Sequence, residues 1–386
     1  MLSRKIKKLK NWLQNRKNLQ LFRLQLAEDK QKTAAYRVVL VSHELSATGA
    51  PLMLLSAAAA ILADGGRVRV LAYMDGLLRQ EFEALGIPVF FHPAFRDNAA
   101  LLNEFAADCA YAVANTVVAY PAVNLLKDIN VLWWIHEGQV IEKDYIARFR
   151  KKKIRPDLEG TLRSAKKIAV VSDYARQVVG RYNALADVLS LARKDVAAVQ
   201  GFEPKIPREK IRIGMLGAVC EIKGQDIVLE ALRNLPRDYR AQIELHIAGR
   251  QDNDFAQALL VGSKDMPEIF WEAPKQGNEL WQFYRDNDAV LVASRDESFS
   301  LVALEACMAY RPLIVSSHVG AKFLVVSGKN GFIFENENAE SLCQMIIRLV
   351  DCRDKLADMG RFSRQQYENC GTLESFRQKF LDLLKK

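Results

Sequence analysis

Short apolar runs alternate with helical stretches along most of this chain, and no other feature constrains its fold as strongly. The first run, Tyr36–Ser42, is rich in β-branched residues, which is typical of a strand buried on both faces. A helical stretch, Leu52–Leu62, follows it and ends at Gly65. Strands that alternate with helices form a parallel sheet with helices on both faces. The strands predicted for the first half are 36–42, 67–72, 88–91, 110–114, 131–135 and 167–171.

The alternation is interrupted between residues 186 and 209, where Gly201, Pro204 and Pro207 lie among charged residues, and then it restarts. This stretch is expected to cross between two domains. The strands predicted after it are 211–216, 243–248, 289–293 and 313–316. We therefore predict an α/β protein with two Rossmann-like doubly wound domains at 35–205 and 206–368. Ligands of such sheets bind at the carboxyl ends of strands, here in an expected cleft between the domains.

The positive charge of the chain is concentrated at its N-terminus. The net charge is +9, and residues 1–33 hold ten Lys and Arg residues against Glu28 and Asp29, so the other 353 residues carry only +1. A nearly neutral body without a basic, aromatic groove excludes nucleic acid as the main partner.

The basic N-terminal segment, residues 1–34, is expected to form an amphipathic helical arm outside the main fold. Leu2, Ile6, Leu9 and Leu13 recur at helical spacing, and Leu19, Phe22 and Leu26 form a second stripe. Such a helix can lie on an anionic membrane surface. Packing on the protein itself, or a solvated tail, fits the same pattern, and the sequence leaves these alternatives open.

The composition bounds the cellular setting. No apolar run is long enough for a transmembrane helix, and the N-terminus lacks the apolar core of a signal peptide. The six cysteines are scattered without a C-x-x-C pair, which argues against a zinc site or a disulfide framework. A cytoplasmic protein is therefore expected.

The stretch Ser294–Ala309 holds the most informative chemistry. Glu297 follows a predicted strand, a helix is expected to begin near Ser300, and Glu305 lies about a turn and a half inside it. The free N–H groups and positive dipole end of a helix suit a diphosphate. Carboxylates accept hydrogen bonds from sugar and ribose hydroxyls. The alternative is a capped helix with two solvated acids.

These residues resemble the signature of glycosyltransferase family 4, whose members have the GT-B fold. The resemblance rests on Glu297-x7-Glu305, with Phe299 between the acids and Leu-Glu-Ala at 304–306. It continues in family order at the other motifs. These are a phosphate loop at 217–224 with Lys223, the strand at 245–249, the strand and sugar-side loop at 311–320, and the G-x-N-G turn and strand at 327–334.

The resemblance implies a retaining transferase that moves a sugar from a UDP- or GDP-type donor to a glycan or lipid-linked acceptor. In the family the first acid contacts the donor sugar and the second holds the ribose, which assigns these roles to Glu297 and Glu305. Lys223 would bind the diphosphate. The backbone N–H groups of residues 299–301 (Phe299, Ser300 and Leu301) would approach the phosphate and the sugar. No metal or other cofactor is expected.

The N-terminal half supplies further expected site residues by the same resemblance. The turn at Gly49 would abut the donor phosphates, and His136, in Trp133–Glu137, would lie near the donor sugar. The candidates for acceptor contact are His43, Glu44 and Glu137. The C-terminal helix, expected in 369–386, would return to the N-terminal domain. The implied setting is bacterial surface polysaccharide or lipopolysaccharide assembly, at the inner face of the cytoplasmic membrane.

The chain departs from the family pattern at three positions. Ala218 stands where the family often has Arg, so one phosphate cation is missing or comes from elsewhere, with Arg212 and Arg250 as candidates. Ser298 and Ser300 replace frequent glycines and narrow the space beside the sugar. Readers of the nucleotide base are expected in the loops near 249–250 and 273–275.

Three other interpretations remain. Asp252-x-Asp254 and Asp286-x-Asp288 have the D-x-D form of metal-binding transferases of a different fold, but their positions beside strands indicate turns. A related enzyme, such as a sugar-nucleotide epimerase or a glycogen-phosphorylase-like protein, would share the fold. A degenerate transferase domain that serves as a partner or scaffold would account for Ala218.

Overall fold

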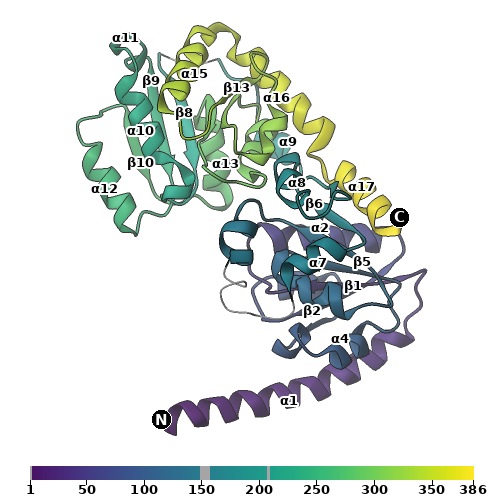
Figure 1. Ribbon diagram of the computed structural model, residues 1–386. Coiled ribbons are helices and arrows are strands. Elements are labelled where there is room, and N and C mark those ends of the chain that lie inside the picture. Colours follow the sequence, from purple (N-terminus) through teal and green to yellow (C-terminus); the bar gives the residue numbers. More distant parts are fainter. Residues whose placement is uncertain (1, 148–156, 207–208) are drawn as a thin grey trace. The chain divides into compact units, whose positions relative to one another are not determined.

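The structure is a computed structural model that describes residues 2–147, 157–206 and 209–386, with the side chains of the first helix described from Lys17 onward. The chain divides into two compact units (Figure 1). Unit 1 comprises Met1–Val171, Arg176–Leu189 and Arg377–Lys386, and unit 2 comprises Ser172–Ala175 and Ser190–Phe376. The division falls at 189/190 instead of the expected 205/206. Residues 190–205 belong to unit 2 through contacts such as that of Lys205 Nζ with Asp288 Oδ1, at 3.2 Å.

Unit 1 is built on a seven-stranded sheet in the order β3-β2-β1-β4-β5-β6-β7, and its neighbouring strands are parallel. The residues of β1 from Val38 to Val41 have no exposed surface, as expected of a strand covered on both faces. Helices that follow the strands cover the sheet. The strands are β1 Arg37–Ser42, β2 Arg67–Ala72, β3 Val89–Phe91, β4 Tyr111–Asn115, β5 Asn130–Ile135, β6 Ile168–Val170 and β7 Asp187–Val188. The helices are α2 Gly49–Ala63, α3 Arg79–Ala84, α4 Ala99–Ala106, α5 Tyr120–Leu125, α7 Leu158–Ser164, α8 Asp173–Val179 and α17 Leu373–Lys385, of which α8 and α17 are each divided between the units.

Unit 2 repeats the arrangement with a six-stranded parallel sheet in the order β10-β9-β8-β11-β12-β13. Successive side chains of a strand point to opposite faces. Ile213 of β8 packs in the cluster that includes Val228 of α10 and Ile346 of α15, whereas Gly214 faces Phe283 of α13. Helices therefore cover both faces of the sheet. The strands are β8 Ile211–Leu216, β9 Ile243–Ala248, β10 Ile269–Glu272, β11 Ala289–Val292, β12 Leu313–Ser316 and β13 Gly331–Phe334. The helices are α9 Ala197–Gln200, α10 Gln225–Asn234, α11 Arg237–Arg240, α12 Asp254–Gly262, α13 Gly277–Asp286, α14 Leu301–Met308, α15 Ala339–Asp351 and α16 Leu356–Cys370.

The sequence predicts that the N-terminal segment lies outside the main fold. This prediction is wrong for the last part of helix α1, Leu2–Gln31, which packs on unit 1. Phe22 is buried and its ring lies 5.5 Å from Phe90 and 5.4 Å from Phe91 of β3. Asp29, also buried, accepts hydrogen bonds from the guanidinium of Arg69 at 2.8 and 3.3 Å. The stripe of Phe22 and Leu26 thus packs on unit 1. The side chains of Leu2, Ile6, Leu9 and Leu13 lie outside the described residues.

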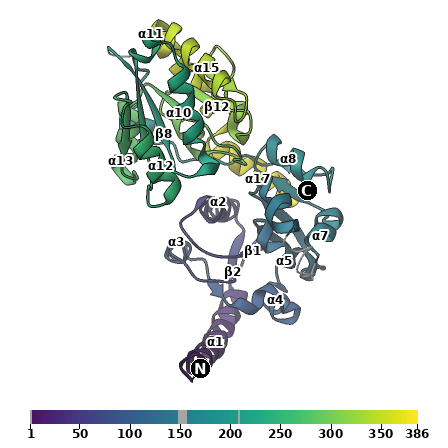
Figure 2. The same ribbon diagram turned by 60° about the vertical axis from the view of Figure 1, so that its left-hand side comes forward.

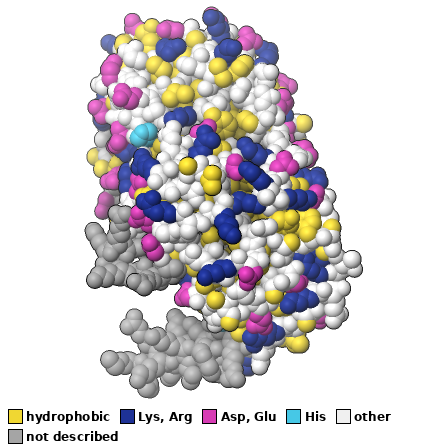
Figure 3. Space-filling model, turned by 45° about the vertical axis from the view of Figure 1, so that its right-hand side comes forward, with side chains coloured by type: hydrophobic (Ala, Val, Ile, Leu, Met, Phe, Trp, Pro, Cys, Tyr) yellow, Lys and Arg dark blue, Asp and Glu magenta, His cyan; other side chains and the backbone are white. Residues whose placement is uncertain are grey.

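The last helix, α17, begins in unit 2 and ends in unit 1 (Figures 1 and 2). The Lys385 ammonium pairs with Asp64 Oδ2 at 2.5 Å, and Phe380 lies 6.2 Å from the ring of Trp134 in β5. No helix among the described residues is long and apolar enough to span a membrane. On the face drawn in Figure 3, Lys and Arg side chains are interspersed with acidic and apolar ones.

Candidate functional site

Three loops meet at the carboxyl edge of the sheet in unit 2. They follow β8, β11 and β12, which are neighbours in the sheet, so their ends lie side by side. The loop after β8 holds Lys223, the loop after β11 holds Glu297, and the loop after β12 leads to Gly320. Carboxyl edges of parallel sheets are where ligands bind, so these loops define the candidate site of unit 2.

The structure brings Glu297 and Lys223 together, 74 residues apart in the chain. Glu297 Oε2 accepts hydrogen bonds from Lys223 Nζ at 3.0 Å and from the Ser294 hydroxyl at 2.6 Å. A carboxylate and an ammonium held in this way present a fixed acceptor and a fixed cation at one point of the edge.

Arg295, which no sequence motif singled out, joins the loops that carry these two residues. Its guanidinium binds the Asp226 carboxylate at 2.9 and 2.7 Å, and its N–H donates to Ile222 O at 2.9 Å. On the other side, the Gly320 N–H donates to Glu297 O at 2.7 Å. The loop of Glu297 is therefore fixed from both neighbouring loops.

Helix α14 begins directly after this loop, with Ser300 as its N-cap. The Ser300 hydroxyl accepts from the Ala303 N–H at 3.3 Å, while the φ of Ser300 is 117°, a value that residues other than glycine rarely adopt. A strained backbone conformation of this kind persists only where the surrounding structure imposes it. The first N–H groups of the helix, near Phe299 and Leu301, lie at the same edge as Glu297 and Lys223, as the sequence predicts.

Glu305, the residue expected to hold the ribose, is enclosed by other side chains. It is buried, its Oε1 accepts from Arg193 Nε at 2.7 Å, and its Oε2 accepts from the Tyr284 hydroxyl at 2.9 Å. Arg193 comes from the segment between the two sheets and Tyr284 from α13. Neither residue could be predicted from the sequence, because neither belongs to a motif and both are distant from Glu305 in the chain.

Arg212 and Arg250 are the two candidates for the phosphate cation that is missing at Ala218, and the structure distinguishes between them. Arg212 starts β8 and binds Glu244 at 3.1 Å, so it lies at the amino end of the strand, away from the phosphate loop. Arg212 is therefore the wrong candidate. Arg250 follows β9, and its carbonyl accepts from the Val219 N–H at 2.9 Å, so it lies beside the loop, with its side chain 3.2 Å from Asp252.

A second cluster lies at the carboxyl edge of the sheet in unit 1, after the neighbouring strands β1, β4 and β5. His43 Nδ1 is 3.2 Å from the Thr116 hydroxyl, and its Nε2 is 3.5 Å from Glu44 Oε1. Glu137 Oε2 accepts from the N–H groups of Val117 at 2.9 Å and of His136 at 3.0 Å. Gly49 opens α2 at the same edge. The expected residues of the N-terminal half thus lie together, and Glu137 fixes the backbone of this edge.

Burial sets the charges in this cluster. It lowers the pKa of His136 to about 3, with a further contribution from His43, and it also lowers the pKa of His43. His136 is therefore a neutral imidazole near pH 7, and its buried Nε2 has no hydrogen-bond partner among the described residues. Burial raises the pKa of Glu137 to about 7 in spite of the bonds from backbone N–H groups.

The raised pKa of Glu137 predicts a pH-dependent stability. A carboxyl whose pKa rises from 4.5 to about 7 on folding stabilises the fold below about pH 4.5, and this contribution is lost as the pH rises through 7. Glu137→Gln, which stays neutral, should therefore exceed the wild type in free energy of unfolding by about 1–3 kcal/mol more at pH 8 than at pH 5. Urea unfolding at both pH values measures this. Glu81→Gln, exposed in the same unit, is the control, and equal pH dependence of the Glu137→Gln variant and the wild type would contradict the prediction.

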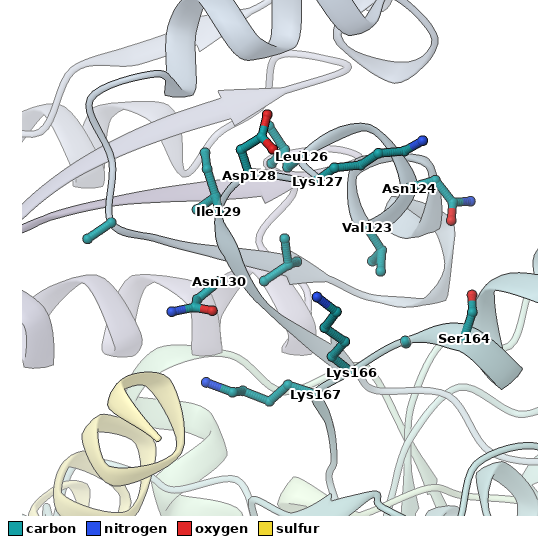
Figure 4. Close-up of a pocket in the computed structure, with 13 residues that line it drawn as sticks. Val123, Asn124, Leu126, Lys127, Asp128, Ile129, Asn130, Ser164, Lys166 and Lys167 are labelled. Carbon is teal, nitrogen blue, oxygen red and sulfur yellow. The ribbon is translucent and has the colours of Figure 1, made fainter.

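Two cavities of the described residues lie apart from these two clusters. One of about 530 Å³ is at the amino edge of the sheet in unit 1, where Lys166 and Asn130 line it (Figure 4). Another, of about 230 Å³, is in unit 2 and is lined by His246, Glu272 and Lys275. Lys275, from one of the loops expected to read the base, pairs there with Glu272 at 2.9 Å.

The two Asp-x-Asp sequences lie at helix ends, one at the start of α12 and the other at the end of α13. Asp254 is the first residue of α12 and Asp286 the last of α13. Asp288 Oδ2 accepts from the Arg212 N–H at 2.8 Å. Among the residues that the structure describes, no group of three or more His, Cys, Asp or Glu side chains is arranged to hold a metal. That no metal takes part stays a prediction.

The sequence matches known families over most of its length. Residues 34–195 match the family described as "Glycosyl-transferase family 4", and residues 199–366 match "Glycosyl transferases group 1". A D-inositol 3-phosphate glycosyltransferase of Arthrobacter sp. is 26% identical over 222 residues, which are 52% of this chain and 53% of that protein. The same-named protein of Pseudarthrobacter chlorophenolicus is 26% identical over 234 residues, 55% of this chain and 56% of its own. The chain thus spans about half the length of these relatives.

Solved structures resemble about 90% of this chain. HepE of Anabaena in complex with UDP has a TM-score of 0.74 at 17% identity and covers 90% of this chain and 99% of its own. The apo form of the lipopolysaccharide outer core galactosyltransferase WaaB has a TM-score of 0.72 at 13% identity, with coverages of 90% and 99%. At these identities the likeness establishes the fold.

Proposed function

Because the chain belongs to the family 4 glycosyltransferases of the GT-B fold, we propose that it transfers a sugar, with retention of configuration, from a nucleotide-sugar donor to a glycan or lipid-linked acceptor. The observation that carries this proposal is the contact of Lys223 Nζ with Glu297 Oε2, 3.0 Å apart, beside the N-terminal end of α14. This contact supports the proposal, because the acid proposed to bind the sugar and the cation proposed to bind the diphosphate lie at one edge of the sheet.

The proposed mechanism assigns a step to each of these groups. The bond between the anomeric carbon and the donor phosphate breaks, and negative charge develops on the leaving diphosphate. Lys223 and the N–H groups of α14 stabilise that charge, and stabilisation of developing charge is usually the largest single contribution to catalysis. The acceptor hydroxyl attacks from the face that the diphosphate leaves, and the diphosphate takes its proton. Glu297 orients the sugar through its hydroxyl groups.

The donor is proposed to be a UDP- or GDP-hexose. HepE of Anabaena was solved with UDP and with glucose, which supports UDP as the first nucleotide to test. A ligand that binds only the folded protein raises its melting temperature. A panel of UDP- and GDP-sugars, each with and without Mg²⁺, should contain one or more that raise the melting temperature without Mg²⁺. A flat response to every donor would contradict the proposal.

The proposed setting is the assembly of surface polysaccharide or lipopolysaccharide at the inner face of the cytoplasmic membrane. WaaB, a lipopolysaccharide outer core galactosyltransferase, shares the fold, which supports this setting. The charge of +8 in residues 1–33 supports contact with an anionic surface, since basic segments there gain about 1 kcal/mol per Lys or Arg.

Vesicle binding tests the membrane contact of the N-terminal segment. The full chain should sediment with phosphatidylglycerol vesicles and not with phosphatidylcholine vesicles, and 0.5 M salt should reduce the bound fraction. Replacing Lys5, Lys7, Lys8 and Lys10 together by Gln should weaken binding at least tenfold, because about four charges leave the interface. A matched set of exposed lysines in unit 2, Lys210, Lys264, Lys329 and Lys355, is the control. Equal binding to neutral vesicles would contradict the proposal.

Ala218 favours a second candidate function, a non-catalytic GT-B partner or scaffold. Calorimetry with each nucleotide-sugar of the panel separates the two, with Glu305→Ala as the control. A scaffold should give no donor-dependent heat. A sugar-nucleotide epimerase would isomerise the donor without an acceptor, whereas a transferase requires the acceptor for turnover.

A further inference from the structure

The carboxylate of Glu305 is held in a way that the family motif does not specify. Its side chain is 6% exposed, and each of its oxygens has a partner, Arg193 Nε at 2.7 Å and the Tyr284 hydroxyl at 2.9 Å. A buried carboxylate is costly unless it is paired and hydrogen-bonded. These two partners therefore determine where the oxygens of Glu305 lie.

Arg193 is fixed by its backbone as well as by its side chain. Its N–H donates to Gly371 O at 3.1 Å, and its carbonyl accepts from the Tyr367 hydroxyl at 2.9 Å. The guanidinium therefore reaches Glu305 from an anchored position and not from a free surface chain. Its side chain is 33% exposed, so the pair lies at the border of the buried interior.

Tyr284 approaches the other oxygen from within the core. Its side chain is fully buried, and burial together with the charge of Glu305 holds the pKa of its hydroxyl well above the ordinary value. Tyr284 is thus a protonated hydroxyl near pH 7 and can donate a hydrogen bond to Glu305. Two donors of different kinds fix the plane of the carboxylate.

We infer that Arg193 and Tyr284 are positioning residues of the donor site, which orient the Glu305 carboxylate so that it accepts hydrogen bonds from the ribose hydroxyls of the nucleotide. A carboxylate has about four acceptor positions, so two remain for the hydroxyls. The inference rests on the proposed function, because it assumes that Glu305 faces the ribose. It adds two residues, both outside the family motifs, to the determinants of nucleotide affinity.

The test compares a nucleoside diphosphate with its 2′,3′-dideoxy form by calorimetry. UDP and GDP are titrated first, and the tighter of the two is used. The wild type should prefer the form with both hydroxyls at least tenfold, since losing a hydrogen bond to a charged group lowers affinity by about a factor of ten or more. Glu305→Ala should remove the preference. Arg193→Gln should lower it to less than threefold while leaving the affinity for the dideoxy form nearly unchanged, and Tyr284→Phe should reduce it in part.

Two further variants separate positioning from general damage. Arg364→Gln is the matched control, because Arg364 binds Asp195 at 3.0 Å, two residues from Arg193, without contacting Glu305. It should keep the wild-type preference. Arg193→Lys retains the charge and should restore part of the preference that Arg193→Gln loses.

Three outcomes decide the matter. A wild-type preference retained in Arg193→Gln would overturn the inference and leave the proposed function standing. Equal losses in Arg193→Gln and Arg364→Gln would also overturn it, because they would show a general effect of the segment. Failure of the wild type to bind either nucleotide would overturn the proposed function and the inference with it.

Discussion

Lys223→Ala should lower the rate of sugar transfer by about 10²–10³-fold, the effect of removing one group that stabilises developing charge. Lys223 Nζ lies 3.0 Å from Glu297 Oε2, and Ala218 stands where the family often has an arginine. In the proposed mechanism Lys223 therefore carries a larger share of the diphosphate charge than it would with a second cation in the loop. The measurement is kcat and KM for the donor identified in the panel.

Two further variants, Lys223→Arg and Lys210→Ala, are the controls for this prediction. Arg keeps the charge but changes its geometry, so Lys223→Arg should retain part of the activity. Lys210 is exposed at the amino end of β8, 3.9 Å from Glu244, and its replacement should leave kcat unchanged. A Lys223→Ala rate within threefold of the wild type would remove Lys223 from the mechanism.

Gly320→Ala should disrupt the donor site by steric conflict. A Cβ at position 320 would lie 1.9 Å from Ser298 O and 2.5 Å from the Ser172 hydroxyl. Because the Gly320 N–H also donates to Glu297 O, the loop that carries Glu297 must move. Overpacking of this kind costs about 1–3 kcal/mol in the free energy of unfolding. Donor affinity should fall at least tenfold, since every 1.4 kcal/mol lost in binding is a factor of ten.

Gly262→Ala is the control for this substitution. It lies at the end of α12, where the nearest atom to an added Cβ is Arg233 Nη2 at 3.7 Å, an ordinary contact. Urea unfolding and donor calorimetry on both variants measure the difference. If Gly320→Ala unfolds and binds donor as Gly262→Ala does, the close approach of these loops is not required for the site.

The two sheets were predictable because a buried parallel strand has a continuous run of apolar residues in its sequence. Val38–Val41 is such a run, and β1, β2, β8, β9 and β12 lie within a residue of their predicted bounds. The strands that were missed carry weaker signals. β7 has only two residues, and β10 has residues of intermediate or high exposure. The burial of Phe22 was equally hidden, because the same stripe fits a membrane surface or a protein core.

The residues of the candidate site were likewise predictable only where a local pattern marks them. Glu297, Glu305 and Lys223 could be found because they lie in motifs with fixed local spacing. Arg193, Tyr284 and Arg295 could not, because their contacts join distant segments. At Ser300 the backbone keeps a conformation suited to glycine, with a φ of 117°, although the residue is serine.

Phosphorus NMR of the reaction tests the central claim most directly. The purified chain is incubated with the stabilising nucleotide-sugar, with and without a lipopolysaccharide-core or lipid-linked glycan acceptor. The account predicts that the nucleoside diphosphate accumulates when the acceptor is present, and that Lys223→Ala and Glu297→Gln suppress it. Turnover of the donor to an isomer without acceptor, or no diphosphate with any donor and acceptor, would contradict it.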